Sequence, residues 1–179
     1  MDEKKKVAKQ RPPKHPPTVK SELLRLLTKI LVVILIFVVL FNFVFGIQRT
    51  ADNTMSPSIK NGDIVLYYRF DKHYVARDVV VITYEGKTQL RRVVAVAGDT
   101  VDITEDGLMI NGSLQYEPEI TKETLPYVEG IKFPVTLKED EVFLLADDRK
   151  DSLDSRVYGP VNVKNIKGKA ISFFRRRGL

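Results

Sequence analysis

The chain contains no cysteine, no tryptophan and only two histidines, His15 and His73. Without cysteine it can form no disulfide, no thiolate metal site and no cysteine nucleophile. His15 lies in a segment rich in proline and lysine, so a serine–histidine–aspartate triad would depend on His73 alone. We expect neither a metal ion nor another cofactor in the functional site.

Excess charge is also missing from most of the chain. The length of 179 residues suffices for one domain with a core plus an appendage. Residues 1–29 hold nine Lys/Arg and three Asp/Glu and so carry the whole net charge of +6, whereas residues 48–179 hold twenty of each. A nucleic-acid-binding domain would carry its positive charge on the folded part. The distribution favours a membrane protein, and we expect no nucleic-acid partner.

A long apolar run follows the basic segment. Residues 30–44 include a single polar residue, Asn42, and the mostly apolar stretch extends over residues 23–47. A bilayer core about 30 Å thick needs about 20 helical residues, so this stretch can cross it. A cleavable signal peptide is the competing interpretation, but the preceding tail is long and no Ala-x-Ala-like site follows. We predict an uncleaved, single-pass anchor in the lipid bilayer.

The flanking charges predict the topology of the chain. Lysine and arginine before an apolar span favour the cytoplasmic side, so residues 1–22 are predicted to form a basic, proline-rich cytoplasmic tail. Such a tail lacks apolar periodicity and is expected to be disordered, with a proline-rich partner site as the alternative. Residues 48–179 then form one extracytoplasmic domain at the cell membrane. A cysteine-free outer domain suits a Gram-positive surface.

The outer domain is predicted to be mainly β, as a barrel or sandwich-like fold, because its apolar runs are short, rich in β-branched residues and separated by turn residues. The predicted strands are residues 64–68, 79–84, 88–96, 101–103, 108–110, 142–145 and 170–174. Asn111-Gly112 is a hairpin-turn signal; with Ser113 it also fits a glycosylation sequon, but the turn explains it better. Residues 115–135 have no clear regular pattern, and we interpret them as a loop or lid.

Three segments of this domain resemble, in order, three motifs of the type I signal peptidases, the serine peptidases of family S26. The motifs are Ser-Met-x-Pro-Thr-Leu, Lys-Arg-Val-Ile-Gly-x-Pro-Gly-Asp and Gly-Asp-Asn-Arg-x-x-Ser-x-Asp-Ser-Arg-x-x-Gly. The matching segments here are residues 54–59, which are followed by Asn61-Gly62-Asp63, residues 90–99 and residues 146–159. With the anchor, the resemblance runs from about residue 23 to the end of the chain. It implies a β-rich extracytoplasmic domain behind one transmembrane helix, with the site near the membrane surface.

The resemblance also assigns roles to individual residues. Active members use a serine nucleophile and a lysine base to release signal peptides from exported preproteins. By resemblance, Thr54 occupies the nucleophile position, Arg91 the base position and Ser152 the position that orients the base, while Asp52 lies where the oxyanion is stabilised. The residues expected to support the site are Met55, Pro57, Asp147, Arg149, Asp154 and Arg156.

The charges of residues 147–156 can also be interpreted without the family. Alternating aspartate and arginine predict charge-assisted hydrogen bonds that hold a loop against the barrel. A solvated charged turn is the simpler alternative.

The key positions depart from the family pattern. Thr54 keeps a hydroxyl, but its extra methyl stiffens χ1 and crowds the approach, and a hydroxyl needs a neighbouring base to become a nucleophile. Arg91 stays protonated, because a guanidinium holds its proton too tightly to act as a base at neutral pH. Asp52 would repel a developing oxyanion; we hypothesise that it pairs with Arg91 and closes the site.

These departures leave three functional hypotheses. The leading one is a non-catalytic protein of export or surface assembly that binds exported preproteins or pilins, similar to the signal-peptidase-like proteins found beside sortases in Gram-positive pilus assembly. A sortase is then a further candidate partner, by analogy alone. The second is an active signal peptidase with Thr54 as nucleophile and a displaced base, with Lys60 and Lys87 as the nearby lysines. The third is an anchored structural domain without a substrate groove.

Overall fold

The computed structural model describes residues 18–150 and 152–175. Most of the predicted tail, residues 1–17, lies outside these ranges, so its predicted disorder stays a prediction. The chain divides into two compact units, Met1–Val38 and Val39–Leu179, and each is described by itself.

An apolar helix dominates the first unit. Helix α1 spans Val19–Val39 and continues as a π-helical segment, Leu40–Val44. The 26 residues Val19–Val44 are long and apolar enough to cross a membrane. The helix ends at Val44 rather than at Ile47, where we predicted the anchor to end. Residues 45–47 belong instead to a β-strand, because their backbone groups pair with the neighbouring strand.

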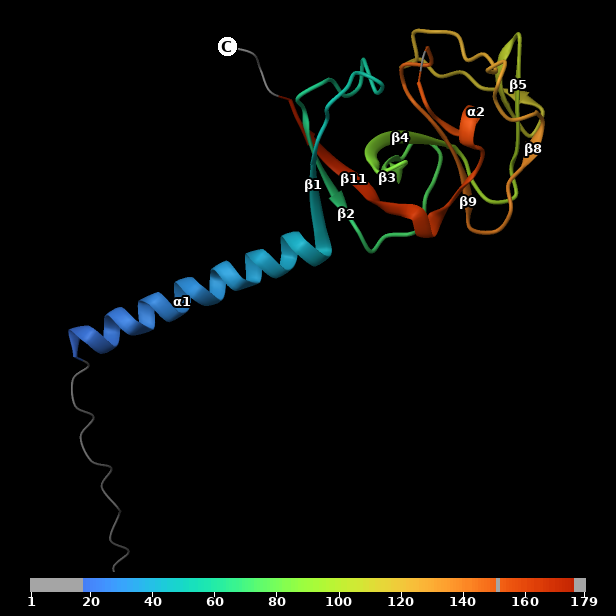
Figure 1. Ribbon diagram of the computed structural model, residues 1–179. Helices are drawn as coiled ribbons and strands as arrows, with labels where there is room; N and C mark the ends of the chain where they lie inside the picture. The colour runs from blue at the N-terminus through green and yellow to red at the C-terminus, as the bar shows by residue number, and fades with distance from the viewer. Residues whose placement is uncertain (1–17, 151, 176–179) are drawn as a thin grey trace, which may run out of the picture. The chain divides into compact units, whose positions relative to one another are not determined.

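The second unit contains two antiparallel sheets (Figure 1). The larger sheet has the order β1-β2-β11-β3-β4-β9-β10, and the smaller has the order β7-β6-β5-β8. The strands of the larger sheet are β1 (Phe45–Arg49), β2 (Ile64–Tyr68), β3 (Val79–Tyr84), β4 (Lys87–Ala95), β9 (Glu141–Leu145), β10 (Val161–Asn162) and β11 (Ile166–Phe174). Those of the smaller sheet are β5 (Thr100–Thr104), β6 (Gly107–Ile110), β7 (Ser113–Leu114) and β8 (Val135–Thr136).

The prediction of a mainly β domain is confirmed. Six of the seven predicted runs lie within strands, and the seventh, 88–96, extends one residue beyond the end of β4. Asn111-Gly112 forms the turn between β6 and β7 with φ of 52° and 79°. Both positive angles suit a two-residue hairpin turn. Two short helical elements were not predicted, α2 (Ser155–Tyr158) and the 3-10 turn Val163–Asn165. They are too short to produce a helical period in the sequence.

Buried side chains form three apolar clusters, and one of them positions the loop between β1 and β2. This cluster consists of Met55, Ile59, Val65, Tyr67, Val81 and Leu90. Met55 and Ile59 are each only 2% exposed, so both ends of the Thr54 turn are held in the core. The loop is closed at its base, since Thr50 N–H donates to the carbonyl of Asp63 at 2.9 Å.

We predict that Gly168→Ala destabilises the folded chain by about 1–3 kcal/mol. An added Cβ would overlap the Tyr68 carbonyl oxygen, a backbone atom that no side-chain rotation can move. Chemical unfolding of the full chain in detergent measures the change. Ser172→Ala on the same strand is the control and should shift stability by less than about 0.5 kcal/mol. An unchanged midpoint for Gly168→Ala would contradict this close approach.

Candidate functional site

The hydroxyl of Thr54 is hydrogen-bonded on both sides. It donates to Oδ1 of Asp52 at 2.7 Å and accepts from Nη1 of Arg91 at 3.0 Å. The same Asp52 oxygen accepts the Thr54 backbone N–H at 3.0 Å, an arrangement in which an aspartate closes a short turn. The proton of the hydroxyl is therefore directed at a carboxylate and its lone pair at a guanidinium.

Arg91 is buried, with 2% of its surface exposed. Its Nε and Nη2 donate to the carbonyl of Leu153 at 3.0 and 2.8 Å, and Nη1 also reaches the carbonyl of Leu90 at 2.5 Å. Within residues 18–150 and 152–175, no carboxylate lies within 4.0 Å of this guanidinium. Arg91 is thus solvated by carbonyl and hydroxyl oxygens, and it joins the Thr54 turn to the segment that follows β9.

The predicted direct pair between Asp52 and Arg91 is wrong. The two residues are linked only through the Thr54 hydroxyl, which bonds to both. The physical reason is local: Asp52 is two residues from Thr54, and its carboxylate satisfies two donors of that residue at once.

The neighbouring Arg92 has a different partner. Its Nε and Nη2 donate to the two oxygens of Asp147 at 2.7 and 2.5 Å, and Nη2 also lies 3.2 Å from Oγ of Ser58. Burial lowers the pKa of Arg92, but the bond to Asp147 and the charges of Asp147, Glu119 and Glu117 together raise the pKa above its ordinary value. This bidentate ion pair joins β4 to the residues after β9. Within residues 18–150 and 152–175, the bonds to Thr54 and Leu153 come from Arg91 and not from Arg92.

The charged side chains expected to support the site, Asp147, Arg149, Asp154 and Arg156, are buried and paired, as the alternating pattern predicted. Asp154 and Arg156 pair with each other at 2.8 Å. Asp154 also accepts from the backbone N–H of Ala146 and of Arg156, so it caps α2. Arg149 instead pairs with Glu117 at 2.7 Å, from the loop before β8. The alternative of a solvated charged turn is wrong, because the exposed fraction of the Arg156 and Asp154 side chains is 1% or less.

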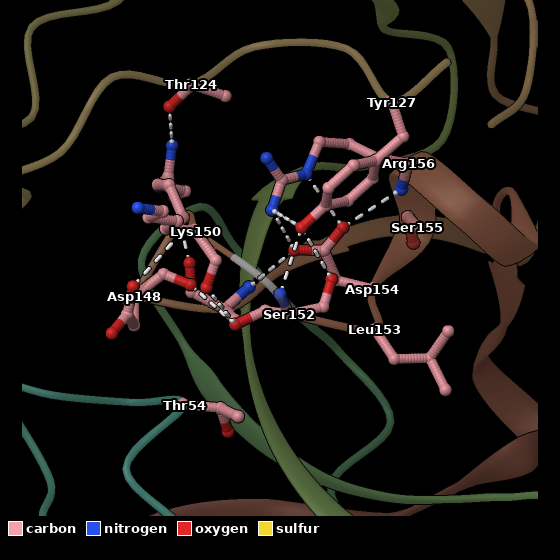
Figure 2. Close-up of polar contacts among 12 residues, drawn as sticks. Thr54, Thr124, Tyr127, Asp148, Lys150, Ser152, Leu153, Asp154, Ser155 and Arg156 are labelled. Atoms are coloured by element: carbon pink, nitrogen blue, oxygen red, sulfur yellow. Dashed lines mark hydrogen bonds and ion pairs between the residues drawn. The ribbon is translucent and has the colours of Figure 1, made fainter. Parts of the chain in front are cut away.

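Ser152 is buried but does not reach the position predicted for it. Its hydroxyl donates to the carbonyl of Asp148 at 2.6 Å, while the neighbouring Leu153 supplies the carbonyl that binds Arg91. The backbone of Ser152 is held by Tyr127, whose hydroxyl donates to Ser152 O at 3.0 Å and accepts from Ser152 N at 2.9 Å. Figure 2 shows Tyr127, Asp154 and Arg156 gathered around Ser152, with Thr54 set apart from them.

The remaining predicted support residues hold the Thr54 turn. Met55 is buried in the core cluster described above, and Pro57 is exposed at the outside of the turn. The backbone N–H of Asp148 donates to the carbonyl of Thr54 at 2.8 Å, which joins this turn to the third motif.

Residues 115–135 supply site contacts that sequence reasoning missed. Glu117, Lys122, Thr124 and Tyr127 all bond to the segment after β9, through Arg149, Asp148, Arg149 and Ser152 respectively. As predicted, this stretch forms a loop without long regular elements. The sequence alone does not indicate these partners, because each lies about 25 residues or more away along the chain.

Among the described residues, Asp52 is the only hydrogen-bond partner of the Thr54 hydroxyl that could accept its proton. Lys60 and Lys87 are exposed, and within residues 18–150 and 152–175 neither forms a hydrogen bond with Thr54. The same residues contain no group of three or more acidic residues or histidines placed to hold a metal ion. The arrangement can bind and orient polar groups, but Arg91 cannot remove the hydroxyl proton.

A strand edge next to Arg91 is unpaired. Strand β4 pairs with β3 through Lys87–Arg92 and with β9 only through Arg92–Ala95. The second edge of residues 87–91 therefore has no strand partner in the described part of the chain. An extended peptide can add to such an edge through backbone hydrogen bonds.

Comparison with known proteins gives one consistent family. The family described as "Signal peptidase, peptidase S26" matches residues 23–174. Signal peptidase I of Bacillus licheniformis is 28% identical over 138 residues, which cover 70% of this chain and 74% of that protein. Signal peptidase I P of Bacillus subtilis subsp. natto is 27% identical over 139 residues, covering 70% and 75%. A signal peptidase I structure from Enterococcus faecalis V583 has a TM-score of 0.45 at 23% identity and covers 56% of this chain and 97% of that one.

We predict that Tyr127→Phe destabilises the folded chain by about 1–3 kcal/mol, because the buried Ser152 N–H loses its acceptor. Tyr116→Phe is the matched control, since Tyr116 is 87% exposed and should show no measurable change. Thermal unfolding of the full chain in detergent gives both values. Equal midpoints for the two variants would contradict a supporting role for Tyr127.

Proposed function

Because the chain belongs to the signal peptidase family, peptidase S26, we propose that it binds exported preproteins or pilins outside the membrane without cleaving them. The chain is signal peptidase I-like, and the family implies preprotein substrates and membrane association. The proposed topology has residues 1–22 in the cytoplasm, one anchor, and residues 48–179 as an extracytoplasmic domain. The basic residues before the span support this orientation. We include pilins as candidate ligands, and a sortase as a second candidate partner, by analogy with the signal-peptidase-like proteins of pilus assembly.

The observation that carries the proposal is the contact between Nη1 of Arg91 and Oγ1 of Thr54 at 3.0 Å. The residue beside the nucleophile position must be able to accept a proton. Removing a proton from arginine at pH 7 would cost roughly 8 kcal/mol, about 6 pKa units at 1.36 kcal/mol each. Arg91 therefore acts as a donor toward Thr54, which is the reverse of what hydrolysis requires.

Asp52 adds a second obstacle to cleavage. Its carboxylate lies 2.7 Å from the Thr54 hydroxyl, next to where negative charge would develop during attack on a peptide carbonyl. A well-placed donor at such a position contributes about 3 kcal/mol to the transition state, whereas a carboxylate repels the oxyanion. Loss of the base and an unfavourable charge together favour binding over catalysis.

Peptide binding does not require the lost base. The unpaired edge of residues 87–91 and the outer edge of β1, the terminal strand of its sheet, offer backbone donors and acceptors to an extended segment. Strand addition draws affinity from main-chain hydrogen bonds, which are independent of the Thr54 chemistry. This supports recognition that survives the loss of hydrolysis.

An active peptidase is the second candidate, and one contact favours it. The Thr54 hydroxyl donates to Asp52 at a distance within the range of a nucleophile and its base. In this alternative Asp52 is the displaced base and Arg91 stabilises the alkoxide. A carboxylate is a weak base at neutral pH, so any cleavage would be slow.

The test measures binding and cleavage separately. We predict that the full chain in detergent binds a fluorescent preprotein that retains its signal peptide, and that it releases no cleaved product. Bacillus licheniformis signal peptidase I, assayed beside it, controls for a cleavable substrate. Cleavage that disappears in Thr54→Ala would overturn the non-catalytic proposal, and loss in Asp52→Asn as well would identify the base. Absence of both binding and cleavage would favour an anchored structural domain.

A second prediction concerns restoration. We predict that Thr54→Ser with Arg91→Lys and Asp52→Gly produces slow cleavage of the same preprotein, because a lysine whose pKa is lowered by burial can act as a base. Lys60→Ala added to the triple variant controls for a base from the loop and should not alter the rate. A folded triple variant that binds the preprotein but never cleaves it would place the defect in the groove rather than in these three positions.

A further inference from the structure

A cavity of about 430 Å³ lies where the ends of β1, β2 and β11 meet, and it is lined by Arg49, Gly62, Ile64, Phe174 and Arg175. We call it the Arg49–Arg175 pocket. The register places Arg49 opposite Ile64 and Ile64 opposite Phe174. Directly paired residues of antiparallel strands have their side chains on the same face. The pocket therefore combines Arg49, Ile64 and Phe174, which share one face of the sheet, with Arg175, the residue that follows Phe174 at the end of β11. Figure 1 shows these three strands side by side.

Positive charge in the pocket exceeds the negative charge near it. Nε of Arg175 lies 3.7 Å from Oδ2 of Asp63, which is buried, and Nη2 of Arg175 donates to the carbonyl of Ser58 at 3.1 Å. No carboxylate lies within 4.0 Å of the exposed Arg49 side chain among residues 18–150 and 152–175. The pocket is suited to an anion.

The rim of the pocket is apolar and exposed. Ile47, Ile64 and Phe174 share one face of the sheet by the register of β1, β2 and β11, and they are 59%, 43% and 60% exposed. Large side chains gathered on one exposed face mark a surface that contacts a partner or a membrane. An anion bound here would have hydrocarbon beside it, as the phosphate of a phospholipid has.

The covalent chain keeps the pocket close to the membrane. The candidate span ends at Val44, and Arg49 is five residues further along an extended strand. At about 3.3 Å per residue, its Cα lies within about 17 Å of the end of the span. Ile64 and Phe174 follow on the next two strands, about 4.8 Å apart. The headgroup layer is therefore within reach of the pocket.

We propose that the Arg49–Arg175 pocket binds the phosphate of an anionic phospholipid in the membrane that anchors the chain. The two guanidinium groups would donate to the phosphate oxygens, and Ile64 and Phe174 would contact the upper part of the acyl chains. This proposal rests on the anchoring part of the proposed function and is independent of whether the protein cleaves anything. It also links lipid to the site, because Arg175 bonds to the Ser58 carbonyl in the turn that carries Thr54.

The absence of cysteine permits a site-specific test. Ser172→Cys places one label on β11, two residues from Phe174 and outside the pocket lining. The full chain, labelled with a small fluorophore, is placed in phosphatidylcholine nanodiscs with a minor fraction of spin-labelled lipid. The spin label sits near the top of the acyl chain of either phosphatidylglycerol or phosphatidylcholine. Quenching by each lipid measures its enrichment at the pocket.

We expect phosphatidylglycerol to be enriched over phosphatidylcholine about fivefold for each arginine, the ratio that about 1 kcal/mol per cation provides. Arg49→Gln with Arg175→Gln should abolish the enrichment. Lys138→Gln with Lys164→Gln removes the same charge from two exposed positions elsewhere and should leave it unchanged. Equal quenching by both lipids, or an enrichment that survives the arginine variant, would overturn the proposal.

Two further measurements distinguish lipid from free phosphate in the pocket, and a failure of the pocket proposal from a failure of the anchor. Inorganic phosphate at constant ionic strength should not displace the lipid; displacement would assign the pocket to free phosphate and overturn the lipid proposal. A single label at Leu35→Cys, on the exposed surface of α1, reports on the anchor. Quenching of that label by both lipids with no enrichment at Ser172→Cys would refute the pocket while supporting the anchor. No quenching at Leu35→Cys would refute the anchor itself, and with it the basis of this proposal.

Discussion

A buried guanidinium must keep its charge, and the surroundings of Thr54 are arranged around that requirement. Arg91 is held by the carbonyls of Leu90 and Leu153 and by the Thr54 hydroxyl, and no carboxylate of the described chain lies within 4.0 Å of it. An isolated buried ion is costly unless its donors are satisfied by oxygen atoms. The hydroxyl that a peptidase would use for attack is here one of those oxygen atoms.

The ion pairs around this centre are independent of catalysis. Arg92 with Asp147, and Arg156 with Asp154, are buried, and each forms two hydrogen bonds within its pair. Removing one partner of such a pair leaves a buried charge unpaired, at a cost of about 3–5 kcal/mol. A stable fold therefore needs these residues whether or not the chain cleaves a peptide. Their presence indicates an intact scaffold and carries no information about activity.

Strand positions were predictable where a strand has a clear apolar run, and the predicted strands 64–68 and 79–84 coincide with β2 and β3. Strand β1 was hidden because its residues continue the apolar run of the anchor, and only pairing with β2 ends the helix before them. Strands β7, β8 and β10 have two residues each, too few to show a period of two. The loop 115–135 was recognised as irregular, but not as the source of partners for Arg149 and Ser152.

By itself the sequence determined the chemical identity of each position: an apolar span, a β-rich domain, and an arginine whose pKa excludes a role as base wherever it folds. Only the tertiary structure decided which groups meet. Asp52 binds Thr54 rather than Arg91, Leu153 rather than the Ser152 hydroxyl reaches Arg91, and Glu117 neutralises Arg149. The Leu153 and Glu117 contacts join residues 62 and 32 positions apart. Burial decides such pairings, because it makes every unpaired charge costly, and burial is a property of the folded chain rather than of any local segment.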